Sequence, residues 1–170
     1  MKLVLAALLV PALASAEPAH EGLAVGAEVG DPASITGAWF TRTLDVALAV
    51  GSGTLAGPGF QTHLDAQLIV AHLGPDIPVR AGLGARIYNQ HYTLMSRDEI
   101  PDWHYGARAS LAVAYQHGSM ELYAELAPGV DLYRTQSCNL ADGAASICPH
   151  AQSKPVFLDF GIGARWFISH

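Results

Sequence analysis

Apolar residues occupy every second position in most of the chain after residue 20, and this pattern constrains the fold more than any other feature. Between residues 79 and 87, for example, Val, Ala, Leu, Ala and Ile alternate with Arg80, Gly82, Gly84 and Arg86. Side chains of a β-strand point alternately to opposite faces of its sheet. Each such segment therefore has one apolar face and one face of glycine, alanine and charged residues.

Turn-forming residues divide this part of the chain into eight expected strands, and no segment shows a helical period. The expected strands cover residues 20–29, 35–41, 44–51, 60–73, 77–88, 103–116, 120–133 and 155–168. Several are longer than the about 9–11 residues that a tilted strand needs to cross a membrane. The pattern therefore predicts an all-β protein.

The connections between these strands alternate in length. Connections 42–43, 74–76 and 117–119 are tight, 30–34 is short, 52–59 is intermediate, and 89–102 and 134–154 are long. Short turns on one rim and long loops on the other are typical of bacterial outer-membrane barrels. We therefore expect an eight-stranded antiparallel up-and-down transmembrane β-barrel with both termini at the short-turn rim.

The first sixteen residues have the features of a secretory signal peptide. Lys2 precedes an apolar run over residues 3–13, and Ala14-Ser15-Ala16 resembles a cleavage site. We expect residues 17–170 to form one exported domain, the barrel. Lys154 is its only lysine and the full chain has a net charge of -6, which argues against a nucleic-acid partner. No later run is apolar over the about 18–20 residues of a transmembrane helix, so any membrane insertion must use strands.

Two kinds of barrel fit the alternation. In a soluble periplasmic barrel of the lipocalin type, the apolar face fills the interior and binds an apolar ligand. In an outer-membrane barrel, the apolar face meets lipid and the charged face lines the lumen. The charged face here is rich in small residues and arginine, which suits a narrow lumen in which charges must pair. We therefore favour the membrane barrel and expect the lumen to be plugged by an ion-pair network of Asp45, Asp65, Arg80, Arg86, Arg108, Glu121, Glu125, Asp159 and Arg165.

Aromatic residues on the apolar face gather near the expected strand ends. Trp39, Tyr115 and Trp166 lie towards the short-turn rim, and Trp103 and Tyr105 towards the loop rim. Aromatic girdles at both interfaces are typical of membrane barrels. The last strand also stays apolar at alternate positions almost to its end, as in the terminal strand that barrel-assembly machinery recognises.

Several short motifs resemble a family of small eight-stranded outer-membrane β-barrels of unknown function, found in spirochaetes and other Gram-negative bacteria. They are Gly30-Asp31-Pro32 with Trp39, Leu44-Asp45, the segments 82–86, 106–108 and 121–128, and 161–167 near the end of the chain. The resemblance covers nearly all of the chain after the signal peptide. It implies a barrel fold and an outer-membrane location, but it does not indicate an activity, since the family has no settled one.

Two clusters of residues deserve a chemical interpretation. His117, Ser119 and Glu121 are similar to the His-x-Ser plus Glu set of outer-membrane lipid A deacylases, where histidine activates serine. They fall, however, in a tight turn on the periplasmic rim, away from the outer leaflet. His63, Asp65 and His104 share the lumen face and could hold a metal ion or relay protons, although structural hydrogen bonding is the simpler interpretation. We expect no catalysis, no metal and no cofactor.

The long loops are the expected place for contacts with other molecules. Cys138 and Cys148 are close in sequence, and in an exported protein such a pair favours a disulfide over a metal site. We expect this loop and residues 95–100 to face outside the cell and to offer a surface to an extracellular partner. The expected role is therefore structural or surface-interacting, for a monomer whose other partners are outer-membrane lipid and the assembly machinery.

Overall fold

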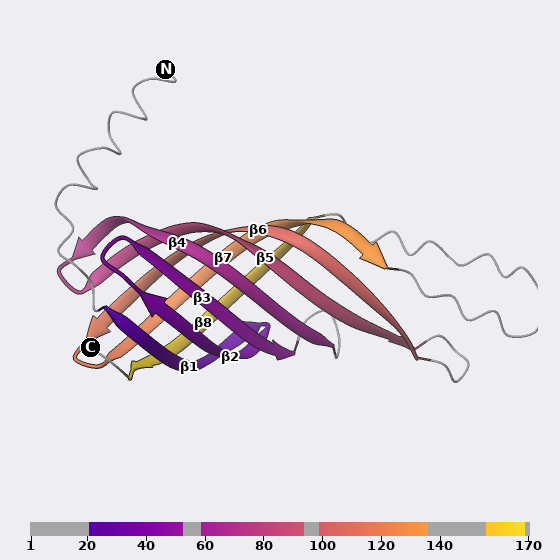
Figure 1. Ribbon diagram of the computed structural model, residues 1–170, viewed down its shortest axis with the longest axis horizontal. Helices are drawn as coiled ribbons and strands as arrows, with labels where there is room; N and C mark the ends of the chain where they lie inside the picture. Colours follow the sequence, from indigo (N-terminus) through magenta and orange to yellow (C-terminus); the bar gives the residue numbers. More distant parts are fainter. Residues whose placement is uncertain (1–20, 53–58, 94–98, 136–155, 169–170) are drawn as a thin grey trace, which may run out of the picture.

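The computed structural model describes residues 21–52, 59–93, 99–135 and 156–168. It contains eight β-strands: β1 (Gly22–Asp31), β2 (Ala33–Phe40), β3 (Leu44–Ser52), β4 (Phe60–Gly74), β5 (Ile77–Thr93), β6 (Glu99–His117), β7 (Met120–Thr135) and β8 (Val156–Phe167). Every strand pairs antiparallel with its neighbour in sequence, and β1 pairs with β8 to close the barrel (Figure 1). The predicted all-β, eight-stranded antiparallel barrel is thus confirmed. The described residues include no helix that is long and apolar enough to cross a membrane.

The predicted tight turns lie at one rim of the barrel, whereas the β5–β6 connection at the other rim is shorter than the predicted 89–102. The turns β2–β3, β4–β5 and β6–β7 lie at one end together with the C-terminal end of β8, on the left in Figure 1. Gly118, in the β6–β7 turn, has a φ of 56°, a conformation that glycine adopts readily. At the opposite end, β1 and β2 are separated only by Pro32, a tighter connection than expected.

Strands β5, β6 and β7 extend further towards the loop rim than the sequence indicated. The β5–β6 ladder continues from Asn89 opposite Trp103 to Thr93 opposite Glu99. Residues 89–93 are mostly polar and show no apolar alternation, so their sequence resembles a loop. Backbone hydrogen bonds between strands do not require an apolar face, and the ladder therefore continues beyond the predicted end at Tyr88.

Exposure alternates along each strand and places the charged face inside. On β3 and β4, Asp45 and Asp65 are each 1% exposed, whereas Leu48 and Leu64 are 48% and 50% exposed. This alternation is interrupted on β4, where the register with β5 shifts between Ile69 and Ala71. The barrel therefore encloses most of the charges on its strands and presents most of its large apolar side chains outwards.

Candidate functional site

The candidate functional site is the polar interior of the barrel. The structure places the side chains of all the residues proposed for the ion-pair network there, each of them 9% exposed or less. These residues come from β3 to β8, and they form two groups, one near the short-turn rim and one near the middle of the barrel. Glu28 on β1 is also buried, so the interior charge reaches the strand that closes the barrel.

Arg80 is the centre of the group near the short-turn rim. Its Nε lies 2.6 Å from Oδ2 of Asp45, and its Nη2 lies 2.6 Å from Oε2 of Glu121. Because β3, β5 and β7 are not adjacent, these two contacts join three parts of the barrel wall. Glu121 also accepts a hydrogen bond from Gln116 at 2.9 Å and lies 3.4 Å from Nη1 of Arg165.

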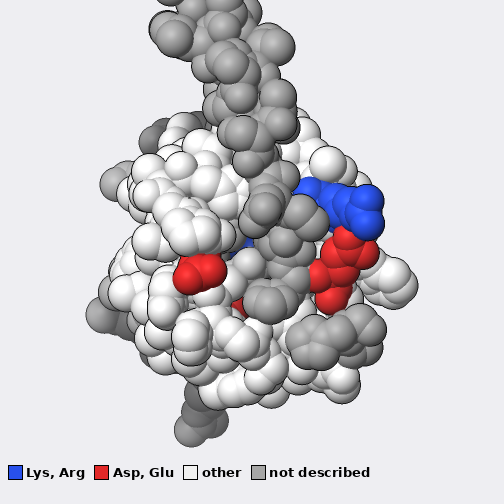
Figure 2. Space-filling view, turned by 90° about the vertical axis from the view of Figure 1, so that its left-hand side faces the viewer, with Lys and Arg blue, Asp and Glu red and all other residues white. Residues whose placement is uncertain are grey.

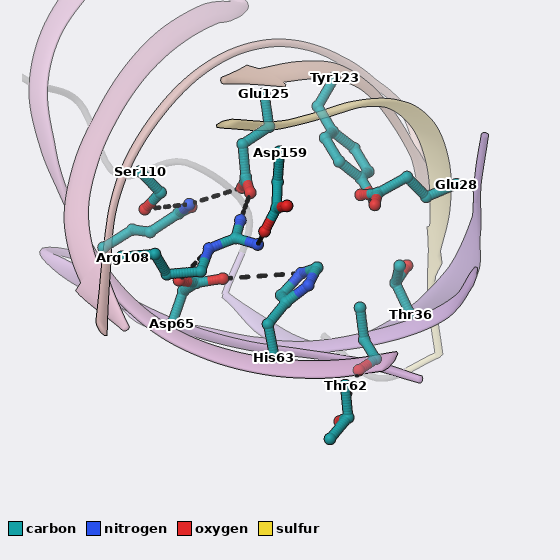
Figure 3. Close-up of polar contacts among 12 residues, drawn as sticks. Glu28, Thr36, Thr62, His63, Asp65, Arg108, Ser110, Tyr123, Glu125 and Asp159 are labelled. Atoms are coloured by element: carbon teal, nitrogen blue, oxygen red, sulfur yellow. Dashed lines mark hydrogen bonds and ion pairs between the residues drawn. The ribbon is translucent and has the colours of Figure 1, made fainter. Parts of the chain in front are cut away.

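Arg108 is the centre of the group in the middle of the barrel (Figure 3). It contacts Asp65 through Nε at 3.1 Å, Asp159 through Nη1 at 3.1 Å, and Glu125 through Nη2. Asp159 is shared with Arg86, whose Nη1 lies 2.7 Å from its Oδ1. One guanidinium therefore faces three carboxylates, and a second guanidinium contacts one of the three.

Aromatic rings cover the faces of three interior guanidiniums, those of Arg80, Arg86 and Arg165. Arg86 lies 3.9 Å from the ring centre of Phe157, and Arg165 lies 4.0 Å from that of Tyr123. Arg80 lies 4.9 Å from the ring of Phe40, which helps to close the short-turn end. Such stacking stabilises a desolvated arginine and fixes the plane of its donors.

Uncharged polar residues complete this interior network, and the sequence argument did not identify them as partners. Gln67 donates to Ser110 at 3.0 Å and to Glu125 at 2.9 Å, and Tyr123 donates to Glu28 at 2.8 Å. The sequence could have indicated them, because each lies an even number of residues from a charged interior residue on its own strand and therefore shares its face. Thr36 and Gln116 have the same role, bonded to Arg165 and Glu121.

The structure separates the three residues considered for a metal or proton-relay cluster. His63 and Asp65 are neighbours on β4, with 3.7 Å between Nε2 and Oδ2. His104 instead faces Asp131, with 2.9 Å between Nδ1 and Oδ2. The residue that does join His63 and Asp65 is Glu125 of β7, and one ligand atom from each of the three lies within 4.8 Å of the others.

The deacylase-like residues do not come together. His117 is exposed and stacks on Tyr115 of the outer face, with 6.2 Å between ring centres. Glu121 is fully buried in the interior, where Arg80 and Arg165 contact its carboxylate. Because His117 and Glu121 lie on opposite faces of the wall, the acid cannot orient the histidine as a serine hydrolase requires.

The expected disulfide between Cys138 and Cys148, the signal peptide and most of the expected loop residues 95–100 lie outside the described residues. No protein-family model, curated protein or solved structure matches the chain. The likeness to the family of small outer-membrane barrels therefore stays a prediction.

Proposed function

We propose that the protein is an integral outer-membrane β-barrel with a closed interior and a structural or surface-interaction role, without catalysis. The observation that carries this proposal is the distribution of side chains between the two faces of the wall. The exposed fractions of large apolar side chains on the outer face reach 74% at Ile35 and 72% at Leu83, and all eight strands contribute. A continuous apolar surface of this kind indicates contact with a membrane or with a large partner.

The arrangement of this outer face favours lipid. Trp39 and Trp166 are 62% and 53% exposed near the short-turn rim, and Tyr105 is 38% exposed near the loop rim. Indole and phenol rings at two levels, with aliphatic side chains between them, match the two interfaces and core of a bilayer. Exposed charge is confined to small areas in the view onto the short-turn end (Figure 2), where Arg42 and Glu21 form an ion pair.

The interior contacts support a barrel that does not conduct ions. Arg80 connects β5 with β3 and β7, and Arg108 connects β6 with β4, β7 and β8. Phe40 and Phe167 pack at 5.0 Å between ring centres near the short-turn end. Ion pairs across the interior thus connect strands that are not neighbours in the barrel wall. An interior with so many charged groups also does not suit an apolar ligand, so we do not favour the lipocalin-like alternative.

Cell fractionation tests the location directly. The full chain, expressed in a Gram-negative host, should appear in the outer-membrane fraction and should migrate differently on a gel before and after boiling. A protein that is soluble in the periplasm without detergent would contradict the proposal.

Recording in a planar bilayer tests the closed interior separately. We expect no steady single-channel conductance from the purified, refolded barrel. Regular channel openings would show that the ion-pair network leaves a path, even if the protein lies in the outer membrane.

The longer connections remain the proposed place for an extracellular partner. Strands β5, β6 and β7 have 17, 19 and 16 residues, and extend the wall on the side of these connections. This extension would hold attached segments away from the membrane surface, where a partner can reach them.

A further inference from the structure

Two buried side-chain atoms in the middle of the barrel lie at a spacing that suits ligands of one cation. Nε2 of His63 and Oδ2 of Asp65 face each other at 3.7 Å, and the two side chains are 3% and 0% exposed. This separation exceeds the about 2.7–3.2 Å of a direct hydrogen bond. Two ligand atoms that bind the same metal ion at about 2.0–2.2 Å lie about 3–4 Å from each other. Glu125 supplies a third donor within 4.8 Å of the other two.

Hydrogen bonds among the described residues do not account for the orientation of the His63 imidazole. Its Nδ1 is buried and has no hydrogen-bond partner among the described residues. Buried polar atoms are almost always paired, because an unpaired one costs about 1–3 kcal/mol. Figure 3 shows the ring directed towards Asp65 and the Arg108 cluster. A metal ion bound at one ring nitrogen makes the other a stronger donor, for which a water molecule is a suitable acceptor.

The carboxylates around Arg108 also outnumber the guanidiniums that contact them. Three carboxylates, those of Asp65, Glu125 and Asp159, contact the guanidinium of Arg108. Among the described residues, only Asp159 also contacts a second guanidinium, that of Arg86. Among these described groups, three negative charges face two positive charges, so negative charge is in excess. An excess of negative charge in a buried site attracts cations.

We propose that His63, Asp65 and Glu125 bind one divalent transition-metal ion, of which Zn²⁺ is the natural probe. One imidazole nitrogen and two carboxylate oxygens without sulfur form a donor set that suits zinc, and three protein ligands leave a position for water. Asp65 can use Oδ2 for the metal while Oδ1 remains with Nε of Arg108. The ion would join β4 to β7, which are not neighbours in the barrel, and would act as a structural brace. This site does not depend on the proposed membrane location.

The test measures zinc retained by the folded, full-length barrel in detergent. The protein is stripped with chelator, incubated with Zn²⁺, and separated from free metal by gel filtration. Wild type should retain one more zinc per chain than His63→Gln and Glu125→Gln, and its thermal unfolding midpoint should rise with Zn²⁺. The matched control is His104→Gln, since His104 is equally buried but lies outside the trio; it should behave as wild type. Loss of a ligand should weaken zinc binding by more than the about 10–100-fold that follows loss of an outer-shell partner.

Zinc X-ray absorption of the wild type provides a readout that needs no variant to fold. It should show nitrogen and oxygen neighbours at about 2.0–2.2 Å and no sulfur. The proposal is overturned if the wild type retains no zinc, if His63→Gln and Glu125→Gln retain as much as wild type, or if the spectrum shows sulfur ligands from the cysteines.

Discussion

Replacing Arg80 by methionine should destabilise the barrel strongly. The side chain is 1% exposed, and it contacts the carboxylates of Asp45 and Glu121 at 2.6 Å each. Methionine keeps much of the volume but leaves these two carboxylates without the charge between them. Removing one partner of a buried ion pair costs about 3–5 kcal/mol. Glu121 retains Gln116 and Arg165, so most of this cost should arise at Asp45.

The assay is urea unfolding of the refolded protein in detergent, followed by tryptophan fluorescence. The matched control is Arg42→Met, which removes an ion pair of 2.8 Å whose partners are 78% and 51% exposed. Exposed pairs contribute about 0–1 kcal/mol, so this variant should unfold almost as wild type does. Combining Arg80→Met with Asp45→Asn should recover part of the loss, because the uncompensated carboxylate is then neutral. A loss below about 1 kcal/mol for Arg80→Met would refute the importance of buried pairing here.

Two further predictions concern the wall of the barrel. Gly163→Ala would place a methyl group against the ring of Tyr123, which donates to Glu28, and should cost about 1–3 kcal/mol in the same urea assay. Gly37→Ala is the control, because the nearest atom to its added Cβ is 3.9 Å away; equal losses for both variants would contradict the packing argument. Ser119→Ala should leave the lipid A profile of the host unchanged by mass spectrometry, since Glu121 lies in the interior and cannot assist His117. A profile that changes with wild-type protein and reverts with Ser119→Ala would restore the hydrolase hypothesis.

The sequence predicted the strands and their faces because both depend on local patterns. A period of two assigns each residue to one side of the wall, and the turn residues fix where the direction reverses. The pattern therefore places Asp45 on the interior face of β3 without knowledge of the fold, and the structure confirms this. The ends of β5 and β6 were not predictable in this way, because residues 89–93 pair through their backbone and carry no apolar alternation.

The partners inside the barrel could not be predicted because they depend on how far each strand is shifted against the others. Arg80 meets Glu121 across 41 residues, and Tyr123 meets Glu28 across 95 residues. The alternation of side chains predicts that His63, His104 and Glu125 all face the interior. Their positions along the barrel axis depend on how far each strand is shifted relative to its neighbours. These positions place His104 beside Asp131 and bring Glu125 to His63.

The central claim is that the apolar outer face of the barrel contacts lipid. The most direct test of this claim is fluorescence quenching by brominated phospholipids. A single tryptophan is introduced as Leu64→Trp, at a half-exposed position in the middle of β4, in a variant whose native tryptophans are replaced by phenylalanine. If the barrel spans the bilayer, bromine atoms near the ends of the acyl chains should quench this tryptophan most strongly, and those near the headgroups less. Fluorescence that is unaffected by bromine at any depth would contradict the account.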